Sequence, residues 1–161
     1  MDEMVTSMGD AIEKRLVQLR DDIAESISSH GLTASGATAK SLVVVRDSAA
    51  ITLYGRAFFP ALETGSSAWT GRTGVRCTFR EFKEVIRNWA SAKGLNFGQA
   101  REHERTIGAI TMSIIRTGTK QTREPRLDVY TSLVDEAVED CGNLCADILS
   151  ARINDAINQW R

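Results

Sequence analysis

The sequence predicts an α+β fold in which a small antiparallel β-sheet packs against helices and long amphipathic helices lie at both ends of the chain. Three observations predict it. Apolar residues recur every three or four positions through most of the chain, only one pair of β-branched segments flanks a turn, and 42% of the 161 residues are apolar. A chain of this length buries enough surface to fold without a disulfide or a metal. We therefore expect a single domain over 1–161, divided into an N-terminal helix (1–30), an α+β core (33–120) and a C-terminal helix (127–161).

The two terminal helices follow from their apolar stripes. In the first, one face carries Val5, Met8, Ile12, Leu16, Leu19, Ile23 and Ile27, and Gly31 follows as a stop. In the last, apolar residues run from Leu133 to Trp160 in a stripe wider than one neighbouring helix readily covers. This helix can fold back along the first as an antiparallel pair, it can meet another chain, or it can do both.

The middle of the chain carries the only strand pair that the pattern predicts. Residues 41–54 read as a hairpin with its turn at Asp47 and Ser48. A short helix over 58–63, closed by Gly65, and a loop over 66–74 follow. Helical periodicity returns over 79–93 and 100–116, and we expect these two helices to pack against the sheet.

The sequence contains no motif that is typical of a catalytic, metal-binding or cofactor-binding site. Neither histidine lies in a zinc-ligand spacing, and His103 sits in a charged run typical of a solvated helix face. Cys141 and Cys145 share a helix face and read as small core residues, with thiols favoured over disulfides. Nucleophile elbows and phosphate-binding glycine motifs are absent. We predict no enzymatic activity, no catalytic residues, no metal and no cofactor. We also expect no membrane span and no export signal.

Charge is segregated along the chain although the net charge is only -1. Residues 1–30 carry seven acids and three bases, 66–126 carry five acids and twelve bases, and 127–161 carry seven acids and two bases. This pattern predicts that the basic middle of one subunit contacts an acidic terminal helix of the next. Solvated helix faces are the simpler alternative.

A basic stripe within the middle segment supports a second reading. It consists of Arg72, Arg76, Arg80, Lys83 and Arg87, at intervals of three and four residues. Such a stripe is typical of phosphate binding, so the alternative function is a cytoplasmic DNA-associated or regulatory binding module that uses 72–87. Interleaved glutamates and the absence of any DNA-binding motif argue against sequence-specific binding.

The loop over 66–74 is a candidate docking element. Counting Gly65 just before it, three of ten residues are glycines, which make the loop costly to order alone, and it carries Trp69 and Arg72, whose residue types are enriched at interface anchors. We expect it to become ordered against a partner protein. The alternative is an ordinary surface loop.

Several short motifs in this order resemble a known family. The N-terminal helix is followed by Ser-Gly-Ala-Thr-Ala-Lys-Ser-Leu over 35–42, by the hairpin, and by Tyr-Gly-Arg-Ala-Phe-Phe-Pro-Ala-Leu-Glu-Thr-Gly over 54–65. Ile86, Trp89, Lys93 and Gly94 then match an Ile-x-x-Trp-x-x-x-Lys-Gly pattern, and Ala109-Ile110 leads to Gly118-Thr119. Over about residues 33–120 the chain resembles the small tail-completion and head-tail connector (neck) proteins of long-tailed bacteriophages.

The resemblance implies a non-enzymatic virion structural protein that forms a homo-oligomeric ring, expected to contain six copies, at the head-tail junction. DNA would pass through the ring without sequence-specific binding, and the other partners would be connector and tail proteins. The protein would be assembled in the bacterial host cytoplasm and located in the virion, away from membranes. Relatives often carry Lys/Arg-Pro-Gly after the Glu-x-Gly step, where this chain has Ser66-Ser67-Ala68-Trp69, so the role of the loop stays open. The expected interface residues are Trp69, Arg72, Arg76, Arg80, Arg87 and Trp160.

Overall fold

The computed structural model describes residues 2–57, 59–66, 78–119 and 127–159. The described residues divide into two compact units, each of which is treated by itself. The terminal unit takes its residues from 1–31, 39–56 and 128–161, and the central unit takes its residues from 32–38 and 57–127. These units cut across the three predicted segments because the hairpin packs on α1, which in turn pairs with α5.

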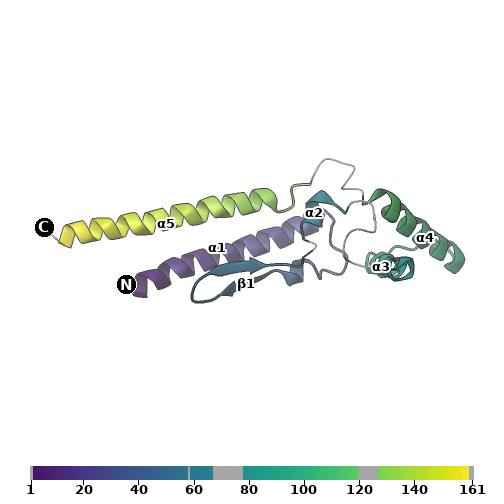
Figure 1. The fold of residues 1–161 in the computed structure, drawn as a ribbon, viewed down its shortest axis with the longest axis horizontal. Coiled ribbons are helices and arrows are strands. Elements are labelled where there is room, and N and C mark those ends of the chain that lie inside the picture. The colour runs from purple at the N-terminus through teal and green to yellow at the C-terminus, as the bar shows by residue number, and fades with distance from the viewer. Residues whose placement is uncertain (1, 58, 67–77, 120–126, 160–161) are drawn as a thin grey trace. The chain divides into compact units, whose positions relative to one another are not determined.

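Two long helices form the body of the terminal unit. Helix α1 (Asp2–Ser29) and helix α5 (Thr131–Gln159) lie side by side and antiparallel (Figure 1). From α1, Leu19, Ile23 and Ile27 are buried, and from α5, Ala137 is buried. The Arg15 Nε atom lies 2.6 Å from Asp140 Oδ2 and fixes the register of the pair. The predicted fold-back of the last helix onto the first is therefore present.

The hairpin packs on α1. After a short 3-10 helix, η1 (Ala39–Ser41), strand β1 (Val43–Arg46) pairs antiparallel with β2 (Ile51–Tyr54), with Val43 opposite Tyr54. The Asp47 carboxylate closes the turn by accepting from the backbone N–H groups of Ala49 and Ala50, at 2.7 and 2.8 Å. These hydrogen bonds lower the pKa of Asp47. The turn is where the sequence predicts it.

Side-chain contacts join the hairpin to the first half of α1. Arg46 Nη1 lies 2.5 Å from Asp10 Oδ1 and 2.9 Å from Glu13 Oε2. Gly9 permits this close approach, because a Cβ atom there would lie 2.5 Å from Arg46 Nη2. Within the terminal unit, α1 is the helix that packs on the sheet. The helices over 79–93 and 100–116 belong to the central unit, so their packing against the sheet stays a prediction. Alternating apolar residues predict a face to be covered, but they do not say which helix covers it.

The central unit is built on a pair of helices, α3 (Phe79–Ala92) and α4 (Ala100–Thr117), preceded by a single turn, α2 (Ala61–Thr64). Helix α3 begins with a capping box, in which Thr78 Oγ1 accepts from the Glu81 N–H and the Glu81 carboxylate accepts from the Thr78 N–H. This contact lowers the pKa of Glu81. Helix α4 ends at Gly118, which has a φ of 77°.

The core of the central unit is small. It consists of Ile86, Ala90 and Ile107, and the partly buried side chains packed against it are Phe82, Phe97, Ile110 and Ile114. A mostly helical chain with a two-stranded antiparallel sheet confirms the predicted α+β class. Helix ends agree with the prediction to within a few residues, since glycine stops and apolar periodicity are local signals.

Candidate interaction surfaces

Helix α5 carries apolar side chains on two faces. The inner face, toward α1, includes the buried Ala137 and the half-buried Leu144 and Ile148. The outer face includes Leu149, Ile153 and Ile157, whose exposed fractions are 50%, 60% and 53%. Because successive residues turn by about 100° around a helix, side chains at steps of four form a continuous stripe. This stripe is turned away from α1, and the described side chains of α1 leave it exposed.

The last turns of α5 also extend beyond the start of α1. Counting outward from the contact between Arg15 and Asp140, the first residue of α1, Asp2, lies opposite about residue 153 of α5. Every residue from Ala151 to Gln159 is exposed. The projecting end of α5 is visible in Figure 1. The predicted surplus of apolar surface on this helix is therefore located on its outer face and at its C-terminal end.

The hairpin has an uncovered apolar face of its own. In the β1–β2 register, the outer face carries Val43, Val45 and Tyr54, with exposed fractions of 49%, 44% and 57%. The opposite face carries Val44, Leu53 and Arg46, and Arg46 is the residue that pairs with α1. Two strands alone are marginal as a sheet, so a sheet with one bare apolar face gains from a further layer.

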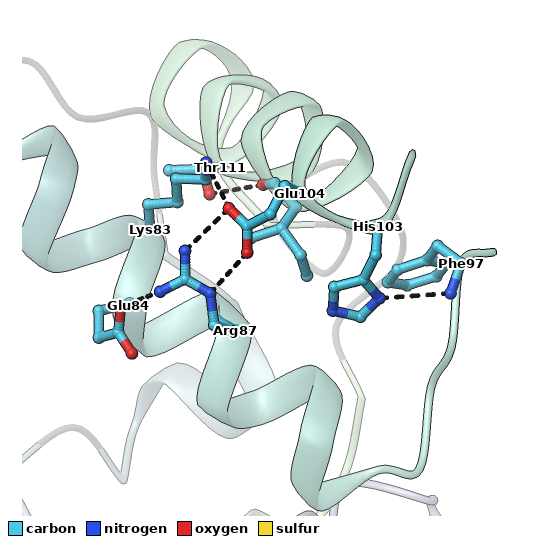
Figure 2. Close-up of polar contacts among 8 residues, drawn as sticks. Lys83, Glu84, Arg87, Phe97, His103, Glu104 and Thr111 are labelled. Atoms are coloured by element: carbon cyan, nitrogen blue, oxygen red, sulfur yellow. Dashed lines mark hydrogen bonds and ion pairs between the residues drawn. The ribbon is translucent and has the colours of Figure 1, made fainter. Parts of the chain in front are cut away.

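In the central unit, a cluster of charges joins α3 to α4 (Figure 2). Arg87 donates from Nε to Glu104 Oε1 at 2.8 Å and from Nη2 to Glu104 Oε2 at 2.9 Å, while Lys83 Nζ lies 2.8 Å from Glu104 Oε2. Arg87 also pairs with Glu84. The hydrogen bonds from Arg87 and then Lys83 lower the pKa of Glu104 to about 2. The sequence reading of a basic stripe missed this partner, because Glu104 is 17 residues from Arg87.

His103 has a structural contact. Its ring lies 5.5 Å from the Phe97 ring, and the Phe97 N–H donates to His103 Nδ1 at 3.4 Å (Figure 2). The side chain is half-buried and helps to fix the turn between α3 and α4. The expectation of a solvated helix face describes Arg101 and Arg105, which are exposed, but it is wrong for His103.

The expected interface residues fall into two groups. Arg80 is exposed on α3, and Arg87 pairs with glutamates within the unit. Trp69, Arg72, Arg76 and Trp160 lie outside the described residues, as does most of the predicted docking loop over 66–74. Of the six, the described structure places Arg80 and Arg87, both on α3.

Two hydrogen bonds join Ser66 to Thr119 in the central unit. The Ser66 N–H donates to Thr119 Oγ1 at 2.8 Å, and the Thr119 N–H donates to the Ser66 carbonyl at 2.8 Å. Ser66 and Thr119 are therefore neighbours in the central unit. The sequence carries no signal for this pairing, since the two residues are 53 apart.

The cysteines of α5 are free and half-buried. Burial raises the pKa of the Cys141 thiol. A raised pKa disfavours the thiolate, which is the reactive and metal-binding form. Cys141 therefore has the properties of a packed side chain.

Searches for other kinds of site give the following results. Within the described ranges, no three His, Cys, Asp or Glu side chains are grouped so that they could hold a metal ion. In the same residues, no helix combines the length and the apolar character needed to cross a membrane. No family model, no curated protein and no solved structure matches the chain.

Proposed function

We propose that this chain is a non-enzymatic structural subunit of a tailed-phage virion, which assembles into a ring at the head-tail junction through which DNA passes. The observation that carries the proposal is the uncovered outer face of α5, with Leu149, Ile153 and Ile157 half or more exposed. A helix with apolar residues on two faces needs a second partner, and the described part of the chain supplies only one. A subunit that is completed by assembly has this property.

Two features of the sequence give the proposal its context. The motifs between residues 33 and 120 resemble phage connector proteins, and that resemblance supplies the virion, the ring and the passage for DNA. The segregated charge, with acidic terminal helices and a basic middle, favours contacts between different surfaces of neighbouring copies. Both features come from the amino-acid sequence and not from the fold.

The alternative function, a DNA-associated or regulatory module, loses support in the central unit. Of its five basic residues, Lys83 and Arg87 contact Glu104 within the chain. A side chain held in an internal ion pair releases fewer counterions on binding a phosphate. The stripe over 72–87 is therefore a weaker phosphate-binding surface than its spacing indicates.

The first test is the mass and shape of the purified chain. Light scattering over a range of concentrations should give particles several times the monomer mass of 17.7 kDa, and electron micrographs should contain rings with a central hole. DNA binding by a monomer or dimer, weakening steeply with salt, would support the alternative instead.

A second test uses the phage that would encode the chain. Inactivating the gene should leave filled heads and free tails that do not join, and supplying the native protein should restore infectious particles. Mass spectrometry of purified virions should detect the chain. Normal virions without it would overturn the proposal whatever the purified chain does in solution.

A further inference from the structure

The outer face of α5 and the outer face of the hairpin cannot cover each other within one chain. Both elements pack on α1, where Arg15 contacts Asp140 of α5 and Glu13 contacts Arg46 of the hairpin. Residues two positions apart project about 200° apart around a helix, so these contacts lie on nearly opposite sides of α1. Figure 1 shows α1 between the two elements. Each chain therefore presents two separate apolar surfaces that face away from each other.

The two surfaces match in length. The stripe from Leu149 to Ile157 covers eight steps of a helix, or about 12 Å. Strand β1, from Val43 to Arg46, covers three steps of a strand, or about 10 Å. A helix laid across a two-stranded sheet is also the usual way in which a bare sheet face becomes covered.

The two elements also carry opposite charge. Helix α5 contains six acidic residues and one basic residue, and the charged residues beside the stripe are Asp147, Arg152 and Asp155, with a net charge of -1. The hairpin and its flanks, residues 39–56, contain three basic residues and one acidic residue, and because Arg46 pairs with α1 on the opposite face, two bases remain against one acid. Two copies of α5 packed on each other would bring acidic helices together, whereas α5 on a hairpin brings opposite charges together. Charge therefore favours the unlike pairing.

We infer that the stripe Leu149, Ile153 and Ile157 of one copy packs on the outer hairpin face Val43, Val45 and Tyr54 of a second copy. This inference rests on the proposed function and names the contact through which copies assemble. The contact joins unlike surfaces, so each copy gives one surface and receives the other. Repetition of such a contact closes into a ring if the rotation per copy allows it. One contact of this size is weak, and closure gives every copy two of them.

Two variants, each with one surface blocked, test the pairing. Ile153→Glu puts a charge into the α5 stripe and Val45→Glu puts one into the hairpin face. Both sites are exposed, at 60% and 44%, so the fold should survive, and circular dichroism with thermal melting checks that it does. The matched controls are Asn154→Glu, about 100° around the helix from the stripe, and Ser48→Glu in the exposed turn.

Each blocked variant should self-associate roughly tenfold or more weakly than the native chain, because the contact would bury an unpaired carboxylate. The decisive measurement is the mixture. A chain blocked only on α5 still offers its hairpin, and a chain blocked only on the hairpin still offers its α5. Mixing the two should give pairs of twice 17.7 kDa that grow no further. The two controls should assemble as the native chain does.

Four results would overturn the inference. They are a mixture that stays monomeric up to about 1 mM, a hairpin variant that assembles normally, assembly lost equally in the controls, and a native chain that stays monomeric up to about the same concentration. If Ile153→Glu alone abolished assembly, α5 would instead pair with α5 of a second copy. None of these results touches the virion test of the proposed function, in which the native chain is sought in purified particles. The two proposals can therefore fail separately.

Discussion

The terminal unit and the central unit are each stabilised by different interactions. In the terminal unit, α1 and α5 are 28 and 29 residues long and bury large aliphatic side chains such as Leu19, Ile23 and Ile27. In the central unit, the shorter helices α3 and α4 share a core of Ile86, Ala90 and Ile107 and add the charged contact at Glu104. The pair α1 and α5 leaves part of its apolar surface exposed, whereas the pair α3 and α4 adds ion pairs to a small apolar core. Surplus apolar surface is what a subunit can offer to a neighbour.

The largest expected effect comes from removing one core side chain from each unit. Ile107 and Ile23 are 0% and 2% exposed, and truncating either to alanine should cost about 2–4 kcal/mol of unfolding free energy through lost burial and a cavity. Hydrogen exchange measured by peptide fragments can assign the loss to a unit. Ile107→Ala should speed exchange in α3 and α4, and Ile23→Ala should speed it in α1 and α5.

If either variant speeds hydrogen exchange equally in both units, the two units are not stabilised separately. In that case the two units unfold as one cooperative body. Ile153→Ala is the matched control, because its side chain is 60% exposed and its loss should change the stability of the isolated chain little.

A smaller effect is expected from acid, at Glu104 in the central unit. The pKa of Glu104 is lowered to about 2 from an ordinary value of 4.5, so the unfolded chain binds a proton there before the folded chain does. The stability that this carboxylate contributes is complete above about pH 4.5 and is lost as the pH falls toward 2.

Glu104→Gln should remove this acid dependence and lower the stability of α3 and α4 at neutral pH by less than Ile107→Ala does. Unfolding by denaturant at a series of pH values measures both. A Glu104→Gln protein with the same slope between pH 4.5 and 2 as the native chain would show that another carboxylate is responsible. Glu102→Gln, at an exposed site on the same helix, is the control.

The smallest effect is a gain in stability. Gly142 lies inside α5 with nothing within 4 Å of an added Cβ, so Gly142→Ala should raise the stability of the terminal unit by about 0.5–1 kcal/mol. Thermal melting should shift upward by a few degrees. A downward shift would show that the backbone at Gly142 is not held in a regular helix.

The sequence predicts the elements of this fold better than their partners. Gly65, Gly94 and Gly118 mark helix ends through interactions with residues a few positions away, so a reading of local pattern finds them. The packing of the hairpin on α1 rests on Arg46 reaching Asp10, 36 residues away, and no spacing rule contains that information.

The candidate surfaces are also predicted only in part by the sequence. The width of the apolar stripe on α5 predicts that part of it stays uncovered, and the outer face carrying Leu149 and Ile153 confirms this for the described chain. The hairpin face is not predicted, because alternation does not say which side of a strand pair is left bare. The pairing of Arg87 with Glu104 is missed for a similar reason, since a basic stripe looks free until the facing helix is known.

The contact between Arg15 and Asp140 joins residues 125 positions apart, whereas Arg87 and Glu104 are only 17 apart. During synthesis, α3 and α4 can therefore meet soon after both have left the ribosome, while α1 has to wait for almost the entire chain. Until α5 is made, the apolar side of α1 has no helix to cover it, and the unit that carries the proposed contact surfaces does not exist. A product that ends before α5 would lack the stripe on that helix, so only copies that contain α5 could both give and receive the proposed contact.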